Sequence, residues 1–397
     1  MKQYWEEKTL GDVLDVLRNG ANCKQDKKGV GDKISRIESI SNADFDINKV
    51  GYATLSKSDK DKHRLLKGDI LFSHINSPIH VGKTALFNSD EEVYHGVNLL
   101  LMRTKSFLNE SYFEHYLKFL FKEGYWKGLC KQSVNQASVN QNDIKKVTIN
   151  FPKSLPQQKQ IVSILDKAFA AIDRAKANAE QNLQNAKELF ESYLQNIFEN
   201  KGDDWEEKTI GDIGKPSMCK RILKEQTTTD GDIPFYKIGT FGKAPNAYIS
   251  KELYEEYKSK YSFPKKGDIL ISASGTIGRR VIYNGEPGFF QDSNIVWIDN
   301  NEKQVLNEYL YSFYGYCDWQ PSKGATISRL YNANLKRIKI TFPKSLQEQK
   351  KVIKKIEVLS NKTKKLEAIY KQKIADLEEM KKSVLQKAFS GQLNTIN

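Results

Sequence analysis

The sequence has little cysteine, and its few cysteines form no recognisable site. The 397 residues include four cysteines, at positions 23, 130, 219 and 317, and none belongs to a C-x-x-C pair. Paired thiols at such spacing are typical of structural zinc sites. The five histidines all lie in the first third of the chain, away from any such motif. We therefore expect free thiols and no metal site.

Long apolar runs and a secretory leader are also absent. No uninterrupted apolar run approaches the roughly 20 residues that a membrane-spanning helix needs. The N-terminal "MKQYWEEKTL" lacks the apolar core of a signal peptide. We expect a cytoplasmic protein with no membrane partner.

The sequence signatures of two classes of enzyme are missing as well. A methyltransferase acting on an amino group of a base would need a Pro-Pro-aromatic motif and a glycine-rich cofactor loop, and the chain has no Pro-Pro. Gly82-Lys83-Thr84 resembles the end of a phosphate-binding loop, but Ser77 stands where that loop requires glycine. The sequence thus predicts no catalytic, cofactor-binding or metal-binding residues. A nucleotide-dependent enzyme is an alternative that ATP binding by the isolated chain would support.

An excess of positive charge is present but unevenly spread. The formal net charge is +14, and residues 344–397 account for half of it, with 13 basic and 6 acidic residues. Residues 1–152 carry +4 and residues 201–343 carry +3. A basic chain favours a polyanionic partner such as double-stranded DNA. If the two larger segments bind DNA, local patches must do it.

An internal duplication organises the whole chain. Four stretches recur in the same order, at offsets that drift from 200 to 191 residues, as expected for two copies with loops of different length. The pairs are "WEEKTLGDV" and "WEEKTIGDI", "KGDILFS" and "KGDILIS", "FPKSLPQQKQIV" and "FPKSLQEQKKVI", and "YLQNIF" and "VLQKAF".

Each copy begins with a mixed segment and ends with a long helix. Runs such as "DILFS", "VNLLLM", "KVTINF", "NIVWI" and "RIKITF" predict strands, and "ESYFEHYLKFLF" and "NEYLYSFYGY" predict amphipathic helices. Asp69 and Asp268 each follow a Lys-Gly turn, which favours a turn or capping role over catalysis. The predicted boundaries are 1–152, 153–200, 201–343 and 344–397.

Two runs of about 42 residues predict the long helices, each roughly 60 Å long. Apolar residues recur at steps of three and four, which is typical of a coiled-coil seam. The seam residues we expect include Ile161, Leu165, Ile172, Leu189, Val352, Ile356, Leu366 and Leu377, with the small residues Ala179, Ala186 and Thr363 at further steps of the same series.

A helix of this length cannot bury its seam on a small domain alone. The simplest solution pairs the two long helices within one chain, antiparallel because the halves are repeats. The expected fold is α+β, with two similar mixed α/β domains joined by an intramolecular antiparallel coiled coil with a pseudo-twofold axis. The alternatives are that each helix packs on its own domain or forms a homodimeric coil.

In these duplicated stretches, and in the closing "VLQKAFSGQL", the chain resembles the specificity subunits of type I restriction-modification systems. The resemblance covers essentially the whole chain, in the family's own order. It implies two target-recognition domains, 1–152 and 201–343, and helices that form the spacer between them. It also implies two docked modification (methyltransferase) subunits, and it allows two restriction subunits to join.

The same resemblance implies a non-catalytic subunit. S-adenosylmethionine, ATP and Mg would be held by partner subunits, with no cofactor in this one. Each domain would read one half of a bipartite, asymmetric site, and the helical spacer would set the gap. An autonomous DNA-binding regulatory or architectural protein is the alternative, and copurification with a modification subunit discriminates between the two.

The loops where the copies diverge are the candidates for DNA contact. They are "HINSPIHVGK" against "ASGTIGRR", and "KQSVNQASVNQND" against "PSKGATISRLYNAN". Lysine and arginine suit phosphates, and asparagine and glutamine suit adenine edges. The candidate DNA-binding residues are Lys83, Arg279, Arg280, Lys323, Arg329, Asn135, Gln136 and Asn140.

Overall fold

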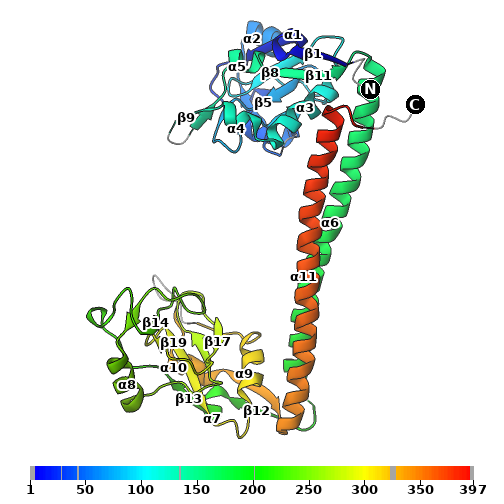
Figure 1. The fold of residues 1–397 in the computed structure, drawn as a ribbon. Coiled ribbons are helices and arrows are strands. Elements are labelled where there is room, and N and C mark those ends of the chain that lie inside the picture. Colours follow the sequence, from blue (N-terminus) through cyan, green and yellow to red (C-terminus); the bar gives the residue numbers. More distant parts are fainter. Residues whose placement is uncertain are drawn as a thin grey trace. The chain divides into compact units, whose positions relative to one another are not determined.

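The structure, a computed structural model, describes residues 5–27, 29–42, 44–133, 136–200, 202–321 and 328–393. The chain packs into two units, one of Met1–Glu180 with Gln372–Asn397 and one of Gln181–Lys371. Each unit contains one mixed domain and a part of both long helices (Figure 1). The expected pair of domains joined by helices is thereby confirmed.

A four-stranded antiparallel sheet forms the centre of each domain, with the same strand order in both. The order is β2-β8-β5-β7 in the first domain and β13-β19-β16-β17 in the second. The first sheet comprises β2 (Leu14–Asn19), β8 (Leu100–Thr104), β5 (Ile70–Phe72) and β7 (Thr84–Leu86). The second comprises β13 (Gly214–Ser217), β19 (Ile295–Asn300), β16 (Ile269–Ser272) and β17 (Arg280–Ile282).

Both faces of these sheets are buried, which explains the continuous apolar runs in the sequence. Successive side chains of a strand point to opposite faces. Ile70 and Phe72 accordingly belong to a core that also contains α3 (Glu110–Lys122), whereas Leu71 belongs to a second core on the other face. In the second domain Ile269 and Leu270 divide in the same way.

A two-stranded ladder connects each domain to its long helix. β1 (Trp5–Thr9) pairs with β11 (Thr148–Pro152), and β12 (Trp205–Thr209) pairs with β20 (Lys339–Pro343), both antiparallel. The predicted boundaries at residues 152 and 343 fall at the ends of β11 and β20, and the division into independent domains stays a prediction.

The remaining elements surround the central sheets (Figure 1). The first domain also has α1 (Leu10–Val13), β3 (Asp32–Ile34), β4 (Gly51–Ala53), α2 (Lys57–His63), β6 (Ile75–Asn76), α4 (Tyr125–Leu129), β9 (Lys131–Ser133), β10 (Gln136–Ser138) and α5 (Gln141–Lys145). The second has α7 (Ile210–Ile213), β14 (Ile233–Tyr236), β15 (Tyr248–Ile249), α8 (Lys251–Lys260), β18 (Phe289–Phe290), α9 (Asn307–Tyr314) and α10 (Asn332–Arg337).

The two recurring aspartates have the turn role expected of them. The Asp69 carboxylate accepts a hydrogen bond from the Leu66 backbone N–H at 2.7 Å, and the Asp268 carboxylate accepts one from the Lys265 N–H at 2.8 Å. Both bonds close the turn that precedes β5 or β16, so the aspartates are structural. Arg103 also pairs with Asp69, at 2.6 Å.

The long helices are α6 (Leu155–Glu199) and α11 (Leu346–Phe389), of 45 and 44 residues. Pro156 lies in the first turn of α6, where a missing N–H is tolerated. Neither helix contains glycine, and α11 contains no proline. Strong helix formers therefore run through both elements without a breaker.

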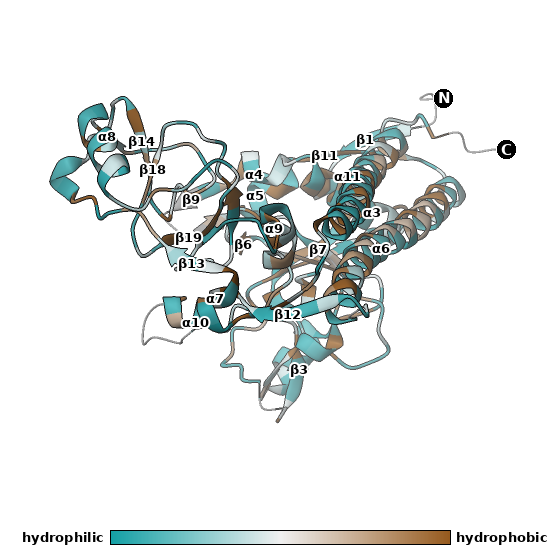
Figure 2. Cartoon of the chain, turned by 90° about the horizontal axis from the view of Figure 1, so that it is seen from below, coloured by the Kyte–Doolittle hydropathy of each residue, from teal (hydrophilic) through white to brown (hydrophobic). Residues whose placement is uncertain are grey.

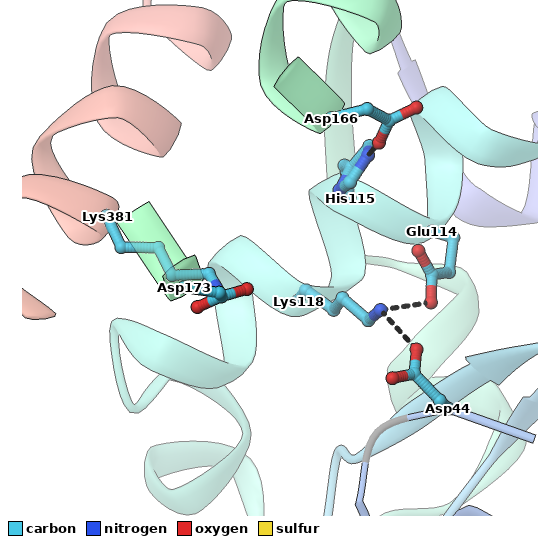
Figure 3. A network of polar contacts seen from close by, with 7 residues as sticks. All are labelled: Asp44, Glu114, His115, Lys118, Asp166, Asp173 and Lys381. Atoms are coloured by element: carbon cyan, nitrogen blue, oxygen red, sulfur yellow. Dashed lines mark hydrogen bonds and ion pairs between the residues drawn. The ribbon is translucent and has the colours of Figure 1, made fainter. Parts of the chain in front are cut away.

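Within the first unit the helices run antiparallel. Asp173 pairs with Lys381 at 2.9 Å, and Lys176 pairs with Glu378, so the numbering rises on one helix as it falls on the other. Figure 3 shows the Asp173–Lys381 pair with two contacts of α3: His115 with Asp166 of α6, and Lys118 with Glu114 and Asp44. The start of α6 and the end of α11 also belong to the core of the first domain, which contains Ile161, Leu165 and Phe389.

In the second unit the same helices share another core. Leu194 and Phe198 of α6 lie in one apolar cluster with Ile353 and Ile356 of α11 and with the central sheet of the domain. Phe198 contacts Tyr309 of α9, with ring centres 5.7 Å apart. Each long helix therefore contributes to the core of both units.

The seam differs from the expected one at two positions. Ile161, Leu165, Ile172 and Ile356 are buried, and Val352 and Leu377 are half-buried. Leu189 is 64% exposed and Leu366 is 41% exposed, so their assignment to the seam was wrong. Figure 2 shows hydrophilic residues over much of both helices.

Small residues occupy other buried positions of the two long helices. Ala179, Ala186 and Thr363 are 1%, 7% and 7% exposed. Alanine allows the helices to approach closely and carries little apolar signal. All three belong to the expected series of steps, so the small residues of that series are buried where Leu189 and Leu366 are not.

Candidate nucleic-acid interface

In the first domain the two divergent loops lie side by side. β6 pairs with β10, with Asn76 opposite Ala137. The Val139 backbone N–H then donates to the His74 carbonyl at 2.9 Å. Segments more than 50 residues apart in the sequence thus form one surface, held by main-chain hydrogen bonds.

The second domain brings its two divergent loops together in the same way. The Leu330 backbone N–H donates to the Ala273 carbonyl at 2.9 Å, and the backbones of Ser274 and Arg329 form an isolated antiparallel β-bridge. A third segment joins them, because the Ala273 N–H donates to the Asn294 carbonyl at 2.7 Å. Both copies therefore present the pair of loops that the sequence singled out for DNA contact.

A glycine beside a tryptophan fixes the turn of the first loop in each domain. Gly82 has φ of +91° and Gly278 has φ of +82°, a region that favours glycine. A Cβ atom would lie 2.2 Å from Cδ1 of Trp126 at Gly82, and 2.1 Å from Nε1 of Trp319 at Gly278. The glycine of the Gly-Lys-Thr stretch is thus required for packing against tryptophan.

Three of the predicted cations have their charged groups against the protein. Lys83 Nζ donates to the Ser41 carbonyl at 2.8 Å, and Arg279 Nη1 donates to the Phe241 carbonyl at 3.0 Å. The Arg280 guanidinium carbon lies 4.5 Å from the centre of the Tyr311 ring. These contacts position the side chains, and DNA contact by them stays a prediction.

The other predicted residues are placed differently. Arg329 is exposed, and its Nη2 lies 3.4 Å from Oδ1 of Asn294. Asn140 caps α5, since its Oδ1 accepts from the Asp143 N–H at 2.8 Å. Lys323 and Asn135 lie outside the residues that the structure describes, and so does the side chain of Gln136.

Three polar side chains in contact with one another support the first loop, and the sequence did not reveal them. Gln141 Nε2 donates to Oδ1 of Asn19 at 2.8 Å, and Asn19 Nδ2 lies 3.2 Å from Nε2 of His74. The three residues come from three separate segments, so no local pattern joins them. The clustering of all five histidines in the first third of the chain was the one available signal.

Buried histidines continue this cluster. Burial lowers the pKa of His74 to about 4 and that of His95 to about 3. His63 is also buried, and burial together with the nearby positive charge of Arg18 lowers its pKa. These rings are neutral at physiological pH, so they support the loop as uncharged groups.

The remaining chemistry of the described residues is limited. Among them no group of three or more histidine, cysteine or acidic side chains is placed to hold a metal ion. In the same part of the chain, no helix combines the length and apolar character that crossing a membrane requires. The paired loops can present side chains to a ligand, and no catalytic set is recognisable in the part of the chain that the structure describes.

Comparison with known proteins identifies the family. The model of the type I restriction modification DNA specificity domain matches residues 2–184 and 202–378. A type I restriction enzyme specificity subunit of Haemophilus influenzae is 47% identical over 268 residues, which span 65% of this chain and 66% of that protein. The MjaX specificity subunit of Methanocaldococcus jannaschii is 31% identical, over 98% of this chain and 93% of that protein.

A solved structure shares the fold. A chain from a study of complex assembly and conformational transition of the type I R-M system superposes with a TM-score of 0.74 at 17% identity, covering 98% of this chain and 99% of that one. The duplicated family match agrees with the duplicated sheets and with the paired loops of each domain. The chain therefore belongs to the family of type I restriction-modification specificity subunits and carries two copies of its DNA specificity domain.

Proposed function

We propose that this chain is the DNA-reading subunit of a type I restriction-modification complex, in which each domain reads one half of a bipartite, asymmetric site. The observation that carries the proposal is the convergence of the divergent loops in both copies, at Val139 with His74 and at Leu330 with Ala273. The loops share a backbone arrangement but differ in side chains, so the two half-sites should differ in sequence.

The long helices have two roles in this proposal. Their length sets the number of unread base pairs between the half-sites, and their exposed faces dock two modification subunits. Leu189 of α6 and Val358 of α11 are 64% and 47% exposed, although both are apolar, and they line the same surface pocket. Apolar residues exposed next to one another on a surface are typical of a protein interface. Two restriction subunits would complete the assembly.

The chain is non-catalytic in this proposal. S-adenosylmethionine, ATP and Mg would be bound by partner subunits, which supply methyl transfer and cleavage. This is consistent with Asp69 and Asp268, the recurring carboxylates, which are engaged in turns.

Loss of one bipartite N6-methyladenine motif from the host methylome when the gene is deleted would support the proposal. An unchanged methylome in a strain that expresses the modification subunit would contradict it.

Coexpression separates the proposal from an autonomous DNA-binding regulator. The chain should copurify with the neighbouring modification subunit, and the complex should bind the bipartite duplex. A chain that stays alone and binds DNA as tightly without partners would favour the regulator.

The ruler role has a separate test. Seven residues would be inserted after Glu180 of α6 and seven after Lys371 of α11, a heptad that keeps the seam in register. Each helix would lengthen by about 10.5 Å. The preferred gap should grow by about three base pairs at roughly 3.4 Å each, and an unchanged gap would refute the ruler.

A further inference from the structure

A pocket of about 400 Å³ in the second domain carries an unusual concentration of positive charge. Its described lining includes four basic side chains and one acidic one, Asp292. The basic residues are Arg221, Lys224, Lys237 and Arg329. Three of them lie outside the loops that the sequence analysis proposed for DNA contact.

The pocket adjoins the place where the divergent loops meet. Asn294 belongs to its lining, and Oδ1 of Asn294 accepts from Ser274 Oγ at 2.7 Å. Arg329 lines the pocket, and its backbone also forms the β-bridge with Ser274. A ligand of these loops would therefore reach the pocket without leaving the surface.

One wall of the pocket is a tightly held turn. Gln291 Oε1 accepts from the Ile238 N–H at 2.9 Å, and the Gln291 N–H donates to the Tyr236 carbonyl at 3.0 Å. Ser293 has φ of +59°, which is uncommon for a residue other than glycine. A left-handed serine costs free energy, so the surrounding bonds must hold the turn in place.

The cations of the pocket are mostly unpaired. Arg221 forms an ion pair with Asp292 at 2.9 Å. Lys224, Lys237 and Arg329 form no ion pair among the residues that the structure describes. The lining thus keeps a net charge of about +3, which is unfavourable without an anion nearby.

We propose that this pocket binds backbone phosphates of the half-site that the second domain reads. The inference rests on the proposed function and adds the residues that anchor the DNA. Phosphate oxygens accept charge-assisted hydrogen bonds from lysine and arginine, and such contacts fix the register of a protein on DNA. Arg279 and Arg280, whose guanidinium groups contact Phe241 and Tyr311, do not belong to the lining of this pocket.

The test uses the assembled complex of this chain with its modification subunits. The variant Lys224→Ala/Lys237→Ala removes two charges and no ion pair. The matched control, Lys251→Ala/Lys303→Ala, removes two exposed charges of the same unit that do not line the pocket and form no ion pair among the described residues. Affinity for the cognate duplex and for an unrelated duplex is measured by fluorescence anisotropy over a range of salt concentrations.

The pocket variant should bind both duplexes about 10- to 100-fold more weakly at physiological salt. The slope of log K against log salt should fall in magnitude by about 0.9 for each phosphate that no longer meets a cation. The control should stay within about two-fold, and both proteins should melt at the same temperature as wild type. Adding Arg329→Ala to the pocket variant should weaken binding again.

Two results would overturn the inference. One is a pocket variant that matches the control in affinity and slope. The other is a loss confined to the cognate duplex, which would indicate base reading in place of phosphate binding. Failure of the proposed function looks different, because the wild-type complex itself would then show no preference for a bipartite duplex.

Discussion

Gln158 and Gln349 make the same three hydrogen bonds, one in each half of the chain. Gln158 Oε1 accepts from the Asn109 N–H at 2.7 Å, and its Nε2 donates to the carbonyls of Phe107 and Pro152 at 3.1 and 2.8 Å. Gln349 repeats the pattern with the backbone of Leu306, Gln304 and Pro343, at 2.9, 2.7 and 2.8 Å. Both side chains are fully buried. One glutamine thus fastens the start of each long helix to its domain.

Replacing Gln158 with leucine should destabilise the first unit by about 3 kcal/mol or more. Three backbone groups, one buried and two partly buried, would lose their partner, and an unsatisfied buried group costs about 1–3 kcal/mol. Urea unfolding followed by circular dichroism measures the change. Gln157, which is exposed in the preceding position of α6, provides the control. A Gln158→Leu variant as stable as Gln157→Leu would contradict the role of these bonds.

Gly82→Ala should be far more damaging than Gly124→Ala. Both glycines have positive φ, at +91° and +73°, so both substitutions carry the same backbone strain of about 1 kcal/mol. Only the Gly82 Cβ would clash with Trp126, since nothing lies within 4 Å of the Gly124 position. We expect an additional loss of about 2–3 kcal/mol from overpacking.

Thermal unfolding of the two variants gives the comparison directly. In the second domain Gly278→Ala and Gly275→Ala form the equivalent pair, because an added Cβ at Gly275 also meets nothing within 4 Å. Equal melting temperatures within each pair would show that strain alone explains the glycines.

The first domain should lose stability in mild acid because of its buried histidines. Unfolded His74 takes up a proton near pH 6.5, whereas burial lowers its folded pKa to about 4. The unfolded state therefore binds more protons between these values, and stability falls as the pH drops from 6.5 towards 4. Burial, and then the positive charge of Arg18, lower the pKa of His63 as well, so this ring contributes to the acid loss in the same direction.

The variant His74→Gln keeps a hydrogen-bond acceptor for Asn19 and removes the titration. Between pH 7 and pH 5 it should lose about 1–2 kcal/mol less than wild type. Urea unfolding at the two pH values measures this, with His80→Gln as the control. The same acid loss in wild type and His74→Gln would show that His74 does not contribute.

The seam can be tested with a pair of substitutions on α6. Ala186→Glu would place a carboxylate at a position only 7% exposed and should destabilise the second unit by about 3 kcal/mol or more. Leu189→Glu lies at a position 64% exposed and should change stability by less than about 0.5 kcal/mol. Thermal melting of both variants measures the two losses of stability. A larger loss for Leu189→Glu than for Ala186→Glu would restore Leu189 to the seam.

Much of the fold could be predicted because its determinants are local and occur twice. The run around Ile70 and its counterpart around Ile269 predicted strands, and the turns at Asp69 and Asp268 were correctly assigned. A repeat provides an internal control, since a pattern required by the fold recurs while an accidental one, such as Gly-Lys-Thr, does not.

The details of the coil could not be read from the sequence. The expected steps run through Ala179, Ala186 and Leu189 alike, and the step pattern does not show that the first two are buried while Leu189 is exposed. Partners distant in the sequence were also hidden. Nothing near Arg280 indicates that Tyr311 lies beneath its guanidinium, and nothing near Arg221 indicates a pocket shared with Arg329.

The main-chain pairing of the loops has a consequence for how such proteins diversify. The bonds from Val139 to His74 and from Leu330 to Ala273 use backbone atoms, which every residue except proline can supply. Apart from Gly82 and Gly278, which pack against tryptophan, exposed side chains on these loops can therefore be exchanged at little cost to folding. Under the proposed function, point mutations in the loops of one domain would change one half of the recognised site and leave the other half unchanged.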